Sequence, residues 1–325
     1  MKYHKNITKN NGLLLFLCFL ASPFLEIRAQ MDCPVDSFFL SPQPKQISMN
    51  DLNNSPEDIY HGGQYHAHIL HDYESGFKLY SIAAEMGLKE ARYDLAVMHY
   101  FGKGTPENKK LAFKMIKELA DELMPEAEEF LAVMYYNGDG VERDLQKALQ
   151  YFQKGIALEN TEALLYAGLC LANSEQVDEE KTSKIVDYWT KAAKLGNDVA
   201  KVNLGLLYYD GKIVPQNYEE AFKWFAEAAE VGNIAGVFQT GLCYHNGKGV
   251  EKDIEKAIEY YKKGMEHGDV QCAHNLGSIY CYDKRNLKEA YSCYRIGANK
   301  GFKPSAEMCD KILKYVNSCN AENDK

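Results

Sequence analysis

A serine followed three residues later by a lysine is the first pattern in this chain that could support chemistry. Ser75-Gly76-Phe77-Lys78 spells S-x-x-K, in which a lysine one helical turn away can take the proton from a serine nucleophile. The K-T-G motif that accompanies such acyl-transfer sites does not follow it. The four residues also open a segment with helical periodicity, where serine and lysine are ordinary. We therefore expect no catalytic residues here.

Four histidines close together raise the question of a metal site. His61, His66, His68 and His71 lie beside Gly62-Gly63, and imidazole nitrogens are common zinc ligands. No cysteine accompanies them, and the flanking residues predict a loosely ordered segment. The chain also lacks H-E-x-x-H, G-x-S-x-G and a glycine-rich phosphate loop. The sequence thus predicts no metal, no cofactor and no enzyme activity.

The cysteines are concentrated near the end of the chain. None of the nine forms a C-x-x-C pair, so neither a zinc ribbon nor a thioredoxin-type redox motif is indicated. The sequence leaves the connectivity open, but we expect at least one disulfide among the last five. These are Cys272, Cys281, Cys293, Cys309 and Cys319. Cys170 and Cys243 occupy equivalent core positions two repeats apart and are expected to stay free.

Residues 1–29 have the composition of a secretory signal peptide. Three lysines precede the apolar run Gly12 to Leu20, and the segment ends at Ala29, a small residue suited to cleavage. A retained membrane anchor is the alternative, but the run is shorter than the ~20 apolar residues that a spanning helix needs. We expect an exported protein, periplasmic or secreted, that is not inserted in a membrane after cleavage.

The remaining chain is acidic. Cleavage after Ala29 would remove four basic residues and one acidic residue, so that the net charge of −9 becomes −12. No cluster of lysine and arginine interrupts this acidity. Because an acidic surface repels phosphate backbones, nucleic acid is an unsuitable partner.

One segment recurs along most of the chain at a nearly constant interval. Its central small residue stands at intervals of 36, 36, 37, 36 and 36, at Ala96, Ala132, Gly168, Gly205, Gly241 and Gly277. A second segment alternates with it, and its copies open at the helix-capping residues Asp72, Asp144, Asn217 and Asp253. Apolar residues then recur three and four apart, as on one face of a helix.

Paired glycines separate the first segment from the second, as in Gly102 and Gly104, or Gly247 and Gly249. Glycine there supplies the positive φ angles of a tight reversal. Each unit is thus predicted to be a helix hairpin of about 36 residues, too small to bury its apolar face alone. The predicted fold is all-α, an α-solenoid of stacked hairpins.

The predicted layout has four parts. Residues 1–29 are the signal peptide, 30–71 a proline-containing and loosely ordered leader, 72–302 the repeats, and 303–325 a capping helix and tail. The fourth repeat departs from the pattern because Ser174 and Gln176 replace both turn glycines. The last hairpin has a shortened turn.

The repeat resembles the Sel-one-like repeat of the tetratricopeptide superfamily, and GLCYHNGKGVEKDIEKAIEY from Gly241 to Tyr260 matches it best. The resemblance covers residues 72–316. It implies a right-handed superhelix whose first helices line a concave groove, and an adaptor or scaffold that binds a protein or peptide. We expect a monomer that acts in this way without catalysis.

A bacterial group of cysteine-rich secreted proteins shares the repeat and staples each hairpin with a disulfide. Their association with penicillin binding and β-lactam hydrolysis makes such an enzyme the alternative function. This chain departs from that group, because residues such as Met265 and Ala298 stand where the stapling cysteine would be.

Two rows of residues on the first helices are candidates for partner binding, since side-chain amides can both donate to and accept from an extended peptide. The first row consists of Asp94, Phe130, Tyr166, Asn203, Gln239 and Asn275, and the second of Phe101, Asn137, Asn173, Asp210, Asn246 and Tyr282. Helix capping is the alternative role for the second row. The predicted partner-binding residues are Asp94, Asn203, Asp210, Gln239, Asn246 and Asn275.

Overall fold

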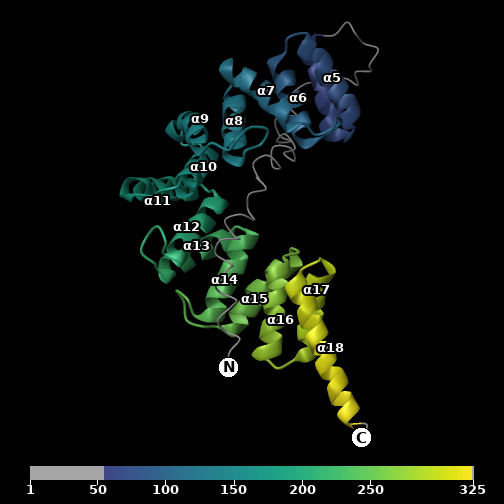
Figure 1. Ribbon diagram of the computed structural model, residues 1–325, viewed down its shortest axis with the longest axis vertical. Coiled ribbons are helices and arrows are strands. Elements are labelled where there is room, and N and C mark those ends of the chain that lie inside the picture. Colours follow the sequence, from purple (N-terminus) through teal and green to yellow (C-terminus); the bar gives the residue numbers. More distant parts are fainter. Residues whose placement is uncertain (1–54, 324–325) are drawn as a thin grey trace. The chain divides into compact units, whose positions relative to one another are not determined.

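The computed structural model describes residues 55–323, and every regular element in this range is helical (Figure 1). The chain divides into two compact units, Met1–Gln176 and Val177–Lys325. The prediction of an all-α solenoid is confirmed. The predicted signal peptide and most of the predicted leader lie outside the described residues.

From residue 55 on, the first unit contains a short π-helical segment and seven α-helices. In chain order they are α4 (Pro56–Gln64), η1 (Tyr65–Ile69), α5 (Tyr73–Glu85), α6 (Lys89–Phe101), α7 (Lys109–Asp121), α8 (Pro125–Asn137), α9 (Leu145–Ala157) and α10 (Thr161–Ala172). Each helix packs against the next one along the chain.

The second unit continues with eight helices. They are α11 (Glu179–Lys194), α12 (Asp198–Asp210), α13 (Tyr218–Glu230), α14 (Ile234–Asn246), α15 (Ile254–Glu266), α16 (Val270–Tyr282), α17 (Leu287–Asn299) and α18 (Lys303–Asn323). Here too each helix packs against its successor. The even-numbered helices from α4 to α16 are the first helices of the hairpins, and α5 to α17 are the second helices.

The glycine at the centre of several first helices makes room for an aromatic ring of the partner helix. A Cβ atom added to Gly205 would lie 2.4 Å from the ring of Phe225, and one added to Gly277 would lie 2.9 Å from the ring of Tyr294. Both rings are fully buried. The small residue is therefore required by packing, as its recurrence suggested.

The predicted helix ends are confirmed. Asp144 and Asp253 accept hydrogen bonds from backbone amides of the first turns of α9 and α15, which satisfies donors that the helix leaves unpaired. Gly102 and Gly247 end α6 and α14 with φ angles of 67°, in the left-handed region that glycine tolerates best.

The second glycine of the turn allows a repeat to pack closely against the repeat before it. A Cβ atom at Gly140 would overlap the carbonyl oxygen of Lys109, at the start of the preceding repeat's second helix, and one at Gly249 would overlap that of Tyr218. The residue between the turn glycines adds to this contact, because the ammonium group of Lys248 lies over the rings of Tyr209 and Tyr218.

An additional hairpin precedes the predicted start of the repeats. α4 and η1 pack against α5, so residues 56–69 are helical and the leader does not extend to residue 71 as predicted. Gly63 is the central small residue of this hairpin, since an added Cβ would lie 2.6 Å from the ring of Tyr80. These two residues are 17 positions apart, as are Gly277 and Tyr294, whereas Gly241 and Tyr261 are 20 apart. The first and last turns are thus both shortened by three residues.

The boundary between the two units falls at Gln176, inside the turn of the fourth repeat. Ser174 and Gln176 replace both turn glycines there, and the hydroxyl of Ser174 donates to the carbonyls of Leu171 and Gln176. The side chain at position 174 thus closes the turn on itself.

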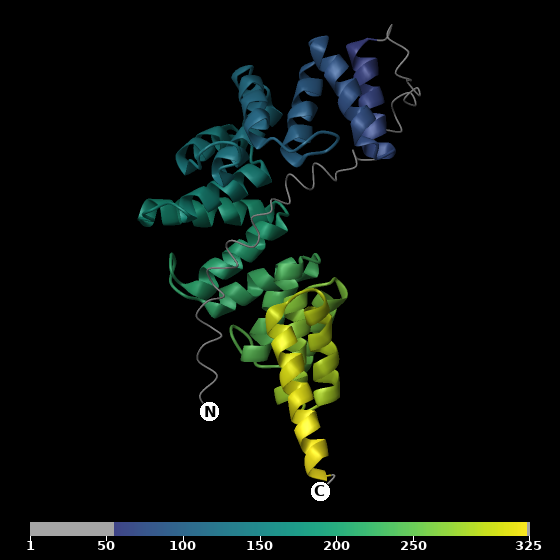
Figure 2. The ribbon, with the colours of Figure 1, turned by 45° about the vertical axis from the view of Figure 1, so that its right-hand side comes forward.

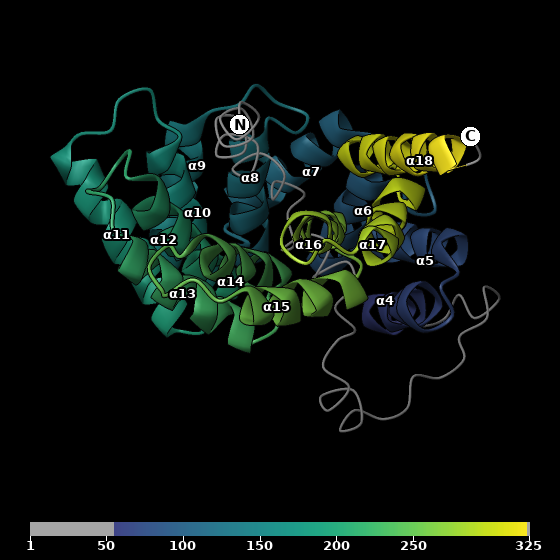
Figure 3. The same ribbon diagram turned by 90° about the horizontal axis from the view of Figure 1, so that it is seen from below.

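α18 covers the last hairpin and lies against α17 (Figure 3). Its buried face holds Ser305, Cys309 and Ile312, and its distal end continues beyond the neighbouring helices (Figure 2). Gly297 of α17 permits the close approach, because an added Cβ would lie 2.6 Å from Oγ of Ser305.

His274 of α16 completes the contact between the last hairpin and α18. Its Nδ1 lies 3.0 Å from Oγ of Ser305, and its ring packs against those of Tyr294 and Phe302. Burial lowers the pKa of His274 below its ordinary value of 6.5, because the charged imidazolium loses its hydration.

We expect the second unit to lose stability in mild acid. The unfolded chain binds a proton at His274 near pH 6.5, while the folded chain resists it, so the stabilisation is complete above that pH and is lost as the pH falls below it. The melting temperature at pH 5 should thus lie below that at pH 7.5. His274→Gln should reduce this difference, and an unchanged difference would contradict the assignment. His245, whose pKa burial also lowers, acts in the same direction.

The six cysteines whose side chains the structure describes are unpaired. Cys170 and Cys243 are free, as predicted. Cys272, Cys281, Cys293 and Cys309 are free as well, and three of these four are buried. The expected disulfide is therefore not formed among these four, and the side chain of Cys319 lies outside the described residues.

Candidate protein-binding surface

The first row of candidate residues lies largely in the interior. Phe130 and Tyr166 are core residues, and Gln239 is 3 % exposed. The amide of Asn275 donates to the hydroxyl of Tyr261 at 3.3 Å. The prediction of an accessible strip is thus wrong for Gln239, because this helix position faces the adjacent hairpin instead of solvent.

The remaining polar residues of the first row are half-buried. Asp94 accepts a hydrogen bond from the hydroxyl of Tyr60 at 2.9 Å, which joins the first hairpin to α6. Burial, and after it the charge of Asp94, raises the pKa of Tyr80 on α5. Asp94 therefore stabilises contacts within the first unit. Asn203 is half-buried on α12.

The second row lies at the carboxyl ends of the first helices, and its side chains reach the surface. In the second unit Asp210 is half-buried, Asn246 is exposed, and Tyr282 is 68 % exposed. Asp210 lies 3.3 Å from the ammonium group of Lys212. In the first unit the amides of Asn137 and Asn173 are used locally, by Asp139 and by the carbonyl of Leu169. The side chains of this row that remain available to bind a partner are thus mainly those of the second unit.

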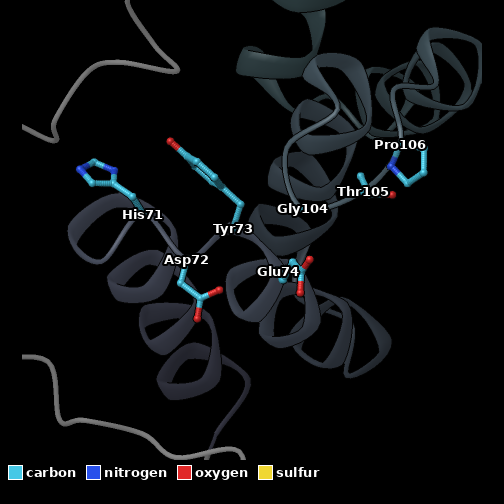
Figure 4. Close-up of a pocket in the computed structure, with 7 residues that line it drawn as sticks. All are labelled: His71, Asp72, Tyr73, Glu74, Gly104, Thr105 and Pro106. Carbon is cyan, nitrogen blue, oxygen red and sulfur yellow. The ribbon is translucent and has the colours of Figure 1, made fainter.

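A shallow hollow of about 530 Å³ lies where the first turn is short (Figure 4). It is lined by His71, Asp72, Tyr73, Glu74, Gly104, Thr105 and Pro106. Asp72 caps α5 by accepting from the amide of Ser75, and hydrogen bonds from Ser75 lower the pKa of this carboxyl. Lys78 is exposed. In this arrangement the serine of the S-x-x-K pattern serves helix capping.

Three of the four histidines near the start of the described chain lie on α4 and η1, and His71 lies in the turn before α5. His61 lies 3.1 Å from Gln64 Oε1, and His66 lies 3.3 Å from Asp72 Oδ2. Within residues 55–323, no three His, Cys, Asp or Glu side chains are grouped so as to hold a metal ion. Nor does any helix of this range combine the length and apolarity needed to cross a bilayer.

The fold defines a class of protein, the helical-hairpin solenoids, whose members present repeated side chains on long surfaces. Seven consecutive matches to the Sel1 repeat cover residues 58–88, 89–122, 125–160, 162–197, 199–233, 235–269 and 270–302. The chain belongs to the Sel1-repeat family. Proteins built from these repeats generally act by binding other proteins.

Two curated relatives share part of this chain. The "DAP3-binding cell death enhancer 1" of Rattus norvegicus is 33% identical over 154 residues, which is 47% of this chain and 30% of the relative. An F-box protein of Arabidopsis thaliana is 37% identical over 84 residues, or 26% of this chain and 22% of the relative. The chain thus matches less than a third of the length of either protein.

Two solved structures share the fold. A protective antigen of uropathogenic Escherichia coli with an SLR fold superposes with a TM-score of 0.64 at 22% identity, over 82% of this chain and 58% of that one. A Sel1 repeat protein from Oxalobacter formigenes gives a TM-score of 0.62 at 24% identity, over 73% of this chain and 98% of that one.

Proposed function

We propose that this protein is an exported adaptor that binds a peptide or another protein on the face formed by the carboxyl ends of its first helices. The observation that carries the proposal is that the second row reaches the surface in the second unit, where half-buried Asp210 and exposed Asn246 and Tyr282 stand at equivalent positions of three consecutive repeats. A carboxylate, an amide and a phenol together offer donors, acceptors and an aromatic surface.

The first row contributes to this surface through Asn203, which is half-buried on α12. Gln239 is buried, and half-buried Asn275 donates a hydrogen bond to Tyr261, so their replacement acts on folding. The curated rat relative is named for binding another protein, which agrees with an adaptor. The alternative of a β-lactam-hydrolysing enzyme gains no support from the capped Ser75 or from the comparisons.

A variant with Asp210→Ala, Asn246→Ala and Tyr282→Ala should keep its melting temperature within a few degrees, since exposed substitutions usually change stability by about 0.5 kcal/mol or less. Its capture of the natural partner should fall at least tenfold, because lost contacts of about 1 kcal/mol each add up. Crosslinking and quantitative mass spectrometry with tagged protein measure this. Lys262→Ala, on a second helix, is the control; full capture by the triple variant would place the partner elsewhere.

The proposal of export depends on the sequence of residues 1–29 alone, so it needs a separate test. Protein recovered outside the cytoplasm should begin at Gln30, one residue after the proposed cleavage site. Terminal sequencing by mass spectrometry gives this directly. An intact Met1 in the mature protein would contradict the proposal of a cleaved signal.

A further inference from the structure

Two loops of the first unit hold the two most exposed large hydrophobic side chains of the described region. Leu123, between α7 and α8, is 71 % exposed, and Leu158, between α9 and α10, is 82 % exposed. They stand in equivalent loops of consecutive repeats. Single exposed leucines are common on protein surfaces, but their recurrence in consecutive loops gives this edge an apolar character of the kind that partners bind.

The backbone of both loops is unusual for this protein. Each second helix of the seven hairpins ends in a residue with positive φ, and five of the seven use glycine there, at Gly87, Gly196, Gly232, Gly268 and Gly301. The two exceptions are Leu123, with φ of 63°, and Glu159, with φ of 54°. Such angles disfavour residues with a Cβ atom. The two loops thus retain strained residues where glycine would be easier, as functional surfaces often do.

The loops are held in place by hydrogen bonds. The amide of Met124 donates to the carbonyl of Leu119, and that of Asn160 donates to the carbonyl of Gly155. The side chain of Asn160 also donates to Glu129 of α8, at 3.3 Å. The leucines are therefore presented in fixed positions.

The charge around the leucines is negative. Asp121, Glu126 and Glu159 take part in no ion pair among residues 55–323. Three nearby bases are already engaged, since Arg92 and Lys89 pair with Glu122 and Lys154 pairs with Glu128. An incoming partner with the opposite charge would find these three carboxylates available.

We infer that the loops 121–126 and 157–160 form a docking surface for a basic amphipathic helix of a partner protein. Residues seven apart on a helix lie on nearly one face, about 10.5 Å apart along its axis. Two apolar residues of the partner at that spacing can thus face the leucine loops while flanking lysines face the carboxylates. This surface is at the opposite end of the first helices from the second row.

A synthetic helical peptide of 18 residues, with two leucines seven positions apart and lysines beside them, is a direct probe. The full chain should bind it in a fluorescence anisotropy titration, and binding should weaken as salt is added. A peptide with the same leucines but glutamate in place of lysine should bind at least tenfold more weakly.

The matched variants are Leu123→Gly with Leu158→Ser, and Leu195→Ser with Val231→Ser at the equivalent edge of the second unit. The first pair should weaken binding at least tenfold while the melting temperature stays equal or rises, because Leu123→Gly relieves the left-handed backbone. The second pair should bind like the natural chain. Absence of binding to the basic peptide, equal binding of both peptides, or equal binding by the first variant would overturn the inference. Self-association that the first variant abolishes would also overturn it, since the occupant would then be a second copy.

Discussion

Replacing Gly249 with alanine should lower the free energy of unfolding of the second unit by about 3 kcal/mol. Two effects combine, since its φ of 73° disfavours a Cβ atom by about 1 kcal/mol, and the added methyl group overlaps the carbonyl oxygen of Tyr218. The backbone must move to accommodate it, at a further cost of about 1–3 kcal/mol. Tryptophan fluorescence during urea unfolding follows this, because Trp189 and Trp224 are the only tryptophans and both belong to the second unit.

Gly232→Ala is the matched control. Gly232 has a comparable φ of 87°, but an added Cβ would meet no atom within 4 Å. The free energy of unfolding of this variant should fall by only about 1 kcal/mol, the cost of a Cβ atom at a positive φ. If both variants lost the same free energy of unfolding, close packing of this turn against the fifth repeat would not stabilise the sixth.

Ending the chain after Gly268 should produce a protein that aggregates or is poorly expressed. The truncation removes α16, α17 and α18 and leaves Tyr261, now fully buried, with one side open to water. In a solenoid each repeat relies on its neighbours for burial. Where the product remains in solution, the melting temperature of the second unit should fall by about 10 °C, as a loss of several kcal/mol implies.

A chain that ends after Ser318 is the control for this truncation. It retains Ile312, the last buried residue described on α18, and should melt like the full chain. Size-exclusion chromatography with light scattering distinguishes monomer from aggregate. A monodisperse product of the shorter chain with unchanged melting would show that the last hairpin and α18 do not cap the unit.

The fold could be predicted from the sequence because its determinants recur. A small residue every 36 positions, a capping Asp or Asn and a pair of turn glycines each have a local physical cause, and repetition separates them from chance. The first hairpin was missed because its turn lacks three residues and its glycine pair. The 17-residue distance from Gly63 to Tyr80, repeated from Gly277 to Tyr294, was the signal that could have revealed it.

The binding surface was less predictable because polarity alone does not reveal which way a helix position faces. Gln239 and Asn246 are both amides on α14, yet one is buried and the other exposed. Gln239 is buried because the adjacent hairpin packs against its side of α14. The residue pattern of a single helix does not show where such a neighbour lies. The positive φ of Leu123 could not be predicted from the sequence either, since only comparison of the backbone angles at all seven helix ends identifies it as an exception.

The contact made by the second turn glycine always runs from one repeat to the repeat before it. Where a repeat carries it, as at Gly104, Gly140 and Gly249, the glycine contacts the repeat that precedes it in the chain. During synthesis that preceding repeat has already left the ribosome, and protein segments generally fold in the order in which they emerge. Each such hairpin can thus dock on a completed template as it appears, so that the array assembles by addition at one end without waiting for the rest of the polypeptide.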